Sequence, residues 1–295
     1  MAFLGEFIAG YVGQKVLDHV LGLFRARGPV PRWDAAIERA VPDIRIHGVV
    51  TAEPQIRLLG RVDLSGEEAA EAAAIRAELE INDPHAMLVE PPQVHLDPVQ
   101  LRARTLDYAE LEALRRRDRH GPVVTAGAVV VCPEKRVVVL HHRSRDSRTF
   151  PDHLHVIGGS YQPPVRDKGV DDHLSLRSAA QREVQEEIGA VITLDNNPPM
   201  LLAEERSERF FQCIVLGAQI SASQLSRLRQ NWEAEGLVQV PYDQLQKLLV
   251  SPPVPWVPTG KGHVLAWLAH GAPGAGRRAK FAGRSAAEVF GQVLS

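Results

Sequence analysis

The spacing of apolar positions changes along the chain, and each change predicts a different kind of element. Helical spacing near the N-terminus, short alternating runs after it and longer helical patterns further on are typical of a mixed α and β region. The predicted elements of the first 120 residues are an amphipathic helix within 4–24, strands at Ile44–Val50 and Gln55–Val62, and helices at Ser65–Glu80 and within 106–121. Ser65 and Glu68 have the spacing of a capping box, which supports the first of these two later helices.

The second part of the chain alternates β-rich runs with helical patterns, which predicts an α/β domain. The predicted strands lie within residues 123–131, 136–142, 209–218 and 236–241, and the predicted helices are Ser175–Ile188 and Ser223–Trp232. A Gly, Ala and basic linker then precedes a short helical pattern at Ser285–Val293. We therefore divide the chain into an N-terminal region (1–120), a central domain (121–272) and a linker with a short C-terminal helix (273–295).

The N-terminal helix is apolar, but charged residues interrupt it, so we expect no transmembrane segment. These residues are Glu6, Lys15 and Asp18. No basic segment precedes the helix, so a secretory signal is not expected either. We expect the helix to pack on the protein itself or on a second copy, which would make a homodimer. The alternative is a membrane-surface helix, because three arginines follow it closely, at positions 25, 27 and 32.

Composition and charge are typical of a soluble globular protein, with 44% hydrophobic and 24% charged residues. The formal net charge of −2 gives no reason to expect specific binding to nucleic acid. The two cysteines, Cys132 and Cys213, each lie in an apolar strand pattern, which predicts buried free thiols. Two cysteines exclude a disulfide framework, and a cytoplasmic location is therefore expected.

The chemically most informative feature is a set of three glutamates with helical spacing. Glu183, Glu186 and Glu187 are three and four positions apart, so a helix projects them from one face. Carboxylates this close repel one another unless a hard divalent cation shares them. Gly189 is placed to end the helix, and Gly158 and Gly159 precede it in a loop after an apolar run. The alternative is a solvated acidic helix face, which the same spacing also produces.

The segment REVQEEIGA resembles the second half of the Nudix box, whose pattern is G-x5-E-x7-R-E-U-x-E-E-x-G-U with U apolar. LHVIGG resembles the family's strand into its Gly-Gly turn, and GLVQVPYDQLQKLL resembles its late strand, proline and short helix. The resemblance covers roughly residues 122–270. It implies an α/β fold with a Nudix-type mixed β-sheet sandwiched by helices, to which this chain adds an N-terminal α+β region.

The chain departs from the box between the Gly-Gly turn and the helix. Gly159 precedes Arg182 by 23 positions, which is nine more than in the box pattern. The position expected for the first box glutamate holds Leu174, and Asp171 or Asp172 could stand in at a different spacing. The extra residues lie within SYQPPVRDKGVDDH, whose composition suits an exposed loop.

The resemblance implies a hydrolase that cleaves the diphosphate linkage of a nucleoside diphosphate joined to another group. Its implied cofactor is Mg²⁺ or Mn²⁺, and its implied metal ligands are Glu183, Glu186, Glu187 and the Gly159 carbonyl. Arg182 would orient a helix glutamate, so the implied catalytic residues are Glu183, Glu186 and Arg182. The alternative is a catalytically weak or inactive Nudix-fold nucleotide sensor in a bacterial signalling or defence system.

The residues that would bind the rest of the substrate are predicted less directly. Arg143 and Arg145 follow a predicted strand with His141 and His142, and could contact phosphates, although a solvated polar loop has the same composition. Glu233 and Glu235 are candidates for the general base or for substrate contact, as Glu183 is for the base. Further candidates, for base stacking, are Phe150, Tyr161 and Phe211.

Overall fold

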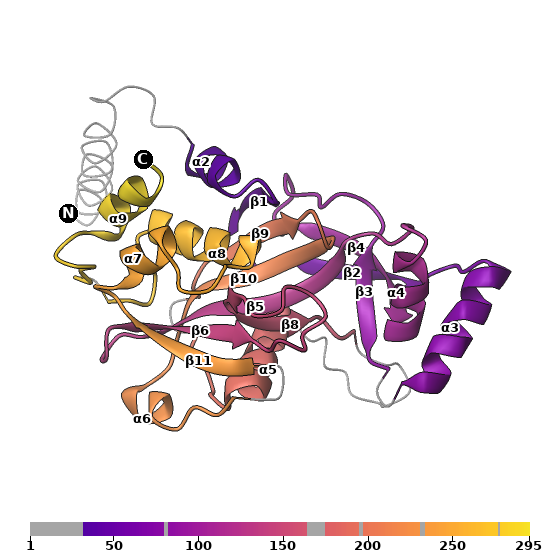
Figure 1. Ribbon diagram of the computed structural model, residues 1–295. Coiled ribbons are helices and arrows are strands. Elements are labelled where there is room, and N and C mark those ends of the chain that lie inside the picture. The colour runs from indigo at the N-terminus through magenta and orange to yellow at the C-terminus, as the bar shows by residue number, and fades with distance from the viewer. Residues whose placement is uncertain (1–31, 80–81, 164–174, 195–196, 231–233, 277) are drawn as a thin grey trace, which may run out of the picture.

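The computed structural model describes residues 32–79, 82–163, 175–194, 197–230, 234–276 and 278–295 (Figure 1). Its strands are β1 (Ile44–Val50), β2 (Gln55–Arg61), β3 (Pro84–Leu88), β4 (Gln100–Asp107), β5 (Val123–Cys132), β6 (Val137–Arg143), β7 (Leu154–His155), β8 (Ile157–Ser160), β9 (Met200–Glu205), β10 (Phe210–Gln219) and β11 (Ala234–Pro241). Its helices are α2 (Trp33–Ala40), α3 (Gly66–Glu78), α4 (Tyr108–Arg115), α5 (Leu176–Ile188), α6 (Ala222–Leu225), α7 (Leu245–Val250), α8 (Pro258–Ala269) and α9 (Ala286–Val293).

One mixed sheet runs through the described part of the chain. Its main path follows the order β1-β9-β10-β5-β3-β4-β2, and β6, β7, β8 and β11 branch from it. The pairs β5–β10 and β2–β4 are parallel, and the other pairs are antiparallel. The parallel β5–β10 pair at the centre sets Gln212 opposite Thr125, a register that matters for the site described below.

Strands from the N-terminal region extend the sheet of the central domain on both sides. β1 pairs with β9 along its length, and β3 meets β5 where Met87 lies opposite Val123. Helices α3 and α4 pack on each other beside β2, β3 and β4 (Figure 1). The shared sheet therefore brings α4 and β3 next to the beginning of β5.

Helices cover both faces of the sheet, and alternation along β5 explains why. Val124, Ala126 and Ala128 belong to the buried cluster that includes residues of α5, whereas Val129 and Val131 belong to the cluster that includes residues of α8. A strand buried on both faces has no polar face to alternate with, and β5 accordingly reads as an almost continuous apolar run. The expected α/β fold, with a mixed sheet between helices and an added N-terminal α+β region, is confirmed.

Most predicted elements are confirmed, and two differ in extent. The helix expected at 223–232 is only α6, because residues 226–230 have no helical conformation. The helix expected to run to Gly121 ends at Arg115. The elements that were not predicted are α2, β3, β4, β9 and α8. The amphipathic helix expected within 4–24 lies outside the described residues, and no helix within them is long and apolar enough to cross a membrane.

Capping contacts fix the ends of the confirmed helices. Ser65 accepts a hydrogen bond from the Glu68 amide while the Glu68 side chain accepts one from the Ser65 amide, so the predicted capping box is present.

Cys132 and Cys213 are buried free thiols, as their apolar surroundings predicted. Burial raises the pKa of the Cys213 thiol.

Candidate functional site

Helix α5 begins and ends where its sequence predicts, and this sets the direction of its glutamates. The Ser175 hydroxyl accepts a hydrogen bond from the Ser178 amide, and Gly189 ends the helix with a φ of +68°. Ala179, Ala180 and Val184 are fully buried against the sheet. With that face buried, Glu183 and Glu187 lie at the edge of the core, while the Glu186 side chain keeps 59% of its surface exposed.

Of the two glycines of β8, Gly159 leaves the space that Glu183 occupies, and Gly158 lets β8 approach the backbone of β5 closely. A Cβ atom at Gly159 would lie 2.2 Å from Glu183 Oε2, and one at Gly158 would lie 2.6 Å from the Gly127 Cα. Both distances are too short for any residue with a side chain unless its neighbours move. The absence of a side chain at Gly159 therefore lets the Glu183 carboxylate of α5 lie directly against the backbone of β8.

Ion pairs and hydrogen bonds join α5 to β8. Arg182 donates from Nη2 to Glu183 Oε1 at 2.5 Å and to the Ser160 carbonyl at 3.1 Å, and its Nε lies 3.8 Å from Glu186 Oε2. Glu187 Oε2 accepts from the Gly158 amide at 3.3 Å and lies 3.5 Å from His141 Nδ1. The Arg182 guanidinium thus bridges Glu183 and β8, and its orienting role in catalysis stays a prediction.

A pocket of about 560 Å³ opens beside these residues, and most of its lining residues fall into four groups. Glu183, Glu186 and residues 158–160 form the first group, which we call the α5 wall. The second group, the N-terminal wall, consists of Asp83, His85, Tyr108, Leu111 and Arg115 from the N-terminal region. The third lies over β9, β10, β7 and the start of α8 and includes Glu205, Gln212, Ile214, His155, Val257 and Thr259. Residues 146–150 of the loop after β6 form the fourth group.

The N-terminal wall carries positive charge into the pocket. The Arg115 guanidinium carbon lies 5.5 Å from the centre of the Phe210 ring, and burial, helped by the nearby Arg148 charge, lowers the pKa of Arg115. Within the described residues, Arg115 makes no ion pair and its Nε has no hydrogen-bond partner. Arg148 pairs with Glu112 and donates to the Tyr108 hydroxyl. An arginine in this setting is suited to bind an anionic ligand.

His85 lies on the same wall as a neutral ring. Burial, followed by the charge of Arg115, lowers the pKa of His85 to about 4, so the imidazole is uncharged at pH 7. Its ring centre is 6.2 Å from that of Tyr108. Neither ring nitrogen has a hydrogen-bond partner within the described residues.

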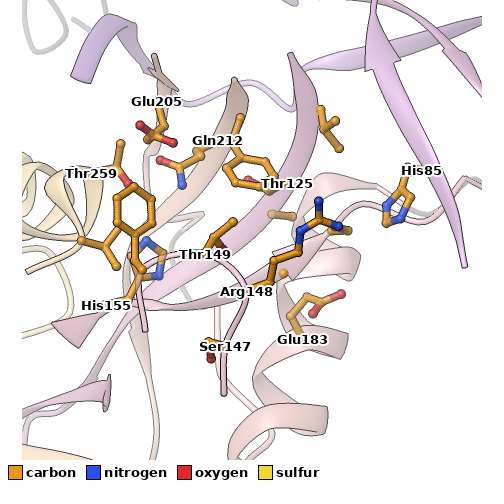
Figure 2. A pocket seen from close by; sticks show the side chains of 18 of the residues that line it. His85, Thr125, Ser147, Arg148, Thr149, His155, Glu183, Glu205, Gln212 and Thr259 are labelled. Carbon is orange, nitrogen blue, oxygen red and sulfur yellow. The ribbon is translucent and has the colours of Figure 1, made fainter. Parts of the chain in front are cut away.

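The opposite end of the pocket is lined by buried polar side chains. Figure 2 shows Glu205, Gln212 and Thr259 gathered there, with Glu183 and His85 on the other side. Gln212 is 6% exposed and Thr259 is fully buried, and neither Gln212 Oε1 nor Thr259 Oγ1 has a hydrogen-bond partner within the described residues. Burial raises the pKa of Glu205 to about 7, and the neighbouring Asp43 carboxylate adds to this effect.

The structure brings some predicted site residues together and separates others. The pocket is lined by Glu183, Glu186, Gly159 and Arg143. Arg182 and Glu187 do not line it but contact Glu183 and the Gly158 amide of the α5 wall. Arg145, with 76% of its side chain exposed, and Glu235 on β11 do not line it. Phe150 lines the pocket, whereas Tyr161 and Phe211 are buried in the cluster that includes α5. Four candidates lie outside the described residues: Asp171, Asp172, Leu174 and Glu233.

Several pocket residues were not predicted from the sequence: His85, Tyr108, Arg115, Arg148, Gln212 and Thr259. Arg115 had a visible signal, because it stands in a run of three arginines at the end of a helix. That position suits a cation whatever its function, since helix carbonyls carry partial negative charge there. Only the pairing of β3 with β5 reveals that this helix end faces the glutamates.

The α5 wall offers oxygen donors to a divalent cation. Within the described residues, no three His, Cys, Asp or Glu side chains converge as a metal-ligand group. The oxygen donors of the α5 wall are nevertheless of the hard type that Mg²⁺ and Mn²⁺ prefer, namely the carboxylates of Glu183 and Glu186 and the backbone of Gly159. The chemistry of these donors fits such a cation.

One family model matches this chain. A family model described as the NUDIX domain matches residues 121–259. A search of curated proteins gave no match. Similar solved structures include a MutT protein from Methanosarcina mazei Go1 (17% identity, 48% of this chain and 91% of that chain, TM-score 0.35) and a NUDIX hydrolase from Alicyclobacillus acidocaldarius (15% identity, 47% and 87%, TM-score 0.35). A third is a bifunctional NMN adenylyltransferase/ADP ribose pyrophosphatase from Francisella tularensis, complexed with AMP and a Mn ion (13% identity, 55% and 45%, TM-score 0.40).

Proposed function

Since residues 121–259 form a Nudix domain and the chain thereby belongs to the Nudix superfamily of pyrophosphohydrolases, we propose that it is a divalent-metal-dependent hydrolase of nucleotide-diphosphate compounds. The bond cleaved is the phosphoric anhydride of a nucleoside diphosphate joined to another group. The observation that carries this proposal is the α5 wall, where Glu183, Glu186 and Gly159 line one pocket at the edge of the sheet.

The α5 wall would hold Mg²⁺ or Mn²⁺ through the carboxylates of Glu183 and Glu186 and the Gly159 carbonyl. A bound divalent cation supplies neutralisation of phosphate charge and a lowered pKa of water. Arg182 keeps Glu183 against β8 through the 2.5 Å contact, which sets the direction of that carboxylate. Glu187 ties the Gly158 amide to α5 and so fixes the spacing between strand and helix.

The N-terminal wall would bind phosphate oxygens of the substrate. Glu112 and Glu208 lie near Arg115, but neither forms an ion pair with it within the described residues, so a diphosphate would give its guanidinium a directly bonded anion. Arg148, on the loop beside it, already pairs with Glu112 and Tyr108 and would add charge without leaving them. Guanidinium groups bind phosphates with two parallel hydrogen bonds, which would orient the anhydride toward Glu183 and Glu186.

A product screen tests this proposal. The purified chain is incubated with nucleoside diphosphate compounds carrying different second groups, in Mg²⁺, in Mn²⁺ and in EDTA, and products are identified by mass spectrometry. We expect a nucleoside monophosphate and the phosphorylated second group from at least one compound, and no product in EDTA. Equal product formation with and without EDTA would contradict a metal-dependent reaction.

The alternative function is a nucleotide sensor without turnover. It is favoured by one observation: in the described ranges no ready-made group of three metal ligands exists, and Glu183 is already engaged by Arg182. A sensor would bind nucleotides and rise in melting temperature without forming product. The screen separates the two functions when each compound is also measured by thermal unfolding.

A further inference from the structure

We propose that the end of the pocket opposite Glu183, where Gln212 and Thr259 line it, recognises the polar edge of a neutral nucleobase. This inference rests on the proposed function, because it names the part of the nucleotide that the end opposite Glu183 would take. It adds to that function a specificity site made of residues outside the glutamate helix and outside the Gly-Gly turn.

Gln212 is the first reason for this assignment. It lies in the middle of the central sheet, on β10 and opposite Thr125 of β5, where neighbouring side chains are mostly apolar. Its side chain is 6% exposed, and Oε1 has no hydrogen-bond partner within the described residues. A buried amide oxygen without a partner is costly in free energy, so its presence points to a partner supplied by a ligand.

Thr259 gives a second, independent signal from a different element. It is the second residue of α8, it is fully buried, and its hydroxyl has no hydrogen-bond partner in the described part of the chain. A threonine in the first helical turn commonly bonds to a nearby backbone group, but here the side chain lines the pocket instead. Two orphaned polar groups on separate elements therefore border the same space.

The bonding capacity of this end matches an uncharged ligand with both donors and acceptors. A glutamine amide offers one donor group and one acceptor, and pairs in bidentate fashion with the edge of a base. His155, also on the lining, donates from Nδ1 to the Val156 carbonyl at 2.7 Å, and burial keeps its pKa well below the usual value. The neutral ring therefore has its other nitrogen, Nε2, as an acceptor.

Charge at this end disfavours a second phosphate. Glu205 borders the same space, with Oε1 accepting from the Ser207 amide at 3.0 Å and Oε2 accepting from the Glu208 amide at 3.0 Å. Its carboxyl group lies close to that of Asp43, so added negative charge would meet two acids. A neutral heterocycle avoids this repulsion.

Apolar neighbours complete the site and suit a flat ring. Ile214 follows Gln212 by two positions, so both side chains lie on the same face of β10. Val257 precedes the first turn of α8, and Phe150 lines the pocket from the loop after β6. Phe150 has a φ of +48°, a backbone conformation that residues with a side chain rarely adopt.

Binding of nucleosides tests the inference without metal or phosphate. Adenosine, guanosine, cytidine and uridine are titrated separately into the full chain in EDTA, with affinities measured by ligand-observed NMR. We expect one nucleoside to bind about tenfold more tightly than the weakest, as for one well-placed bidentate contact. Equal affinities for all four would overturn the proposal.

Matched variants assign the preference to the two residues. Gln212→Met keeps the length of the side chain and removes its polar atoms. It should lower the affinity for the preferred nucleoside about tenfold and so reduce the differences in affinity among the four nucleosides. Thr259→Val keeps the shape, and should weaken the same nucleoside several-fold. Gln239→Leu, at an exposed position of β11, is the control and should leave the ranking unchanged. An unchanged ranking in folded Gln212→Met and Thr259→Val protein would overturn the proposal.

The result is separable from the proposed hydrolysis. Nucleosides lack a phosphoric anhydride, so Glu186→Gln should retain the same ranking. A nucleoside preference that depends on Gln212, in a chain that hydrolyses no compound, would support the base site and contradict the hydrolase. Hydrolysis without any base preference would support the hydrolase and contradict the base site.

Discussion

The α5 wall and the N-terminal wall face the same pocket, but their charged groups are held in opposite ways. On the α5 wall, Glu183 already has a partner in Arg182, and the Gly158 amide already has one in Glu187. On the N-terminal wall, Arg115 and His85 have polar atoms without hydrogen-bond partners in the described residues. A ligand that binds the α5 wall must therefore replace existing contacts within the protein. A ligand that binds the N-terminal wall supplies partners to polar atoms that have none within the described residues.

The difference suggests that the α5 wall determines where the reaction occurs and that the N-terminal wall contributes to substrate affinity. A preorganised carboxylate set fixes the place of the reaction, because its geometry depends on backbone contacts between β8 and α5. An arginine that lacks a partner contributes to affinity, since the ligand supplies its missing anion. Changes on the α5 wall should therefore affect kcat most strongly, and changes on the N-terminal wall should affect KM.

The largest effect is expected from Gly159→Ala. The added Cβ would lie 2.2 Å from Glu183 Oε2, so the carboxylate or β8 must move. We expect kcat to fall about a hundredfold or more, as when a catalytic group is misplaced by about 1 Å. Steady-state hydrolysis assays measure this, with Gly291→Ala as the control because a Cβ there meets no atom within 4 Å. Retention of full activity by Gly159→Ala would contradict the role of the β8 glycines.

Arg182→Lys should have the next largest effect, because lysine keeps the charge and loses the planar contact with Glu183 and the Ser160 carbonyl. A residue that orients a metal ligand typically changes metal affinity by about 10- to 100-fold. The measurement is the Mg²⁺ concentration for half-maximal rate, beside direct Mn²⁺ binding by electron paramagnetic resonance. A loss of kcat at saturating metal, with unchanged Mn²⁺ affinity, would argue against this positioning role.

Arg115→Gln tests the N-terminal wall and should raise KM about tenfold, the size expected for one charge-assisted phosphate contact, with little change in kcat. Arg57→Gln, at an exposed position of β2, is the matched control for the loss of one positive charge. If kcat fell and KM stayed constant, the proposed division between the two walls would be wrong.

The smallest expected effect concerns the pH dependence of stability. Glu205 has a pKa of about 7 in the folded chain against an ordinary value of 4.5, so the folded state holds its proton more tightly than the unfolded state. The contribution of Glu205 to the free energy of unfolding is therefore greatest below pH 4.5. It falls as the pH rises to about 7 and is constant at higher pH. Asp43→Asn removes the neighbouring negative charge that helps to raise this pKa.

We expect Asp43→Asn to reduce the loss of stability between pH 5 and 8 by about 1 kcal/mol, or about 2–4 °C in melting temperature. Thermal unfolding across this pH range measures the effect, and Asp243→Asn at an exposed position is the control. Parallel pH profiles for the two variants would show that Asp43 does not raise the pKa of Glu205.

The sequence predicted the α5 wall far better than the N-terminal wall, and the reason is physical. The glutamates, Arg182 and the glycine at the helix end lie within one short segment, where helical spacing alone determines which side chains share a face. Arg115 and Gln212 reach the same pocket only through pairing between strands distant in the sequence. The hydrophobic periodicity of a short segment does not show which distant strands pair with each other.

Gln212 illustrates the limit in another way. In the sequence it is one polar residue in the apolar run RFFQCIVLGA, which predicts a buried strand but gives no sign of a site. Its meaning comes from the register with Thr125 and from the start of α8, a helix that the apolar periodicity did not predict. The fold could thus be predicted at the level of class, and the site only where its residues are neighbours in sequence.

The most direct test of the central claim is the rate of product formation by Glu186→Gln compared with wild type at saturating Mg²⁺. Mass spectrometry follows release of nucleoside monophosphate, thermal unfolding verifies the fold, and Glu78→Gln, an exposed glutamate of α3, serves as the control. We predict that Glu186→Gln loses at least about 99% of the wild-type rate, as when a group that stabilises transition-state charge is removed, and that Glu78→Gln keeps it. A folded Glu186→Gln chain with the wild-type rate would contradict the assignment of the α5 wall as the hydrolytic site.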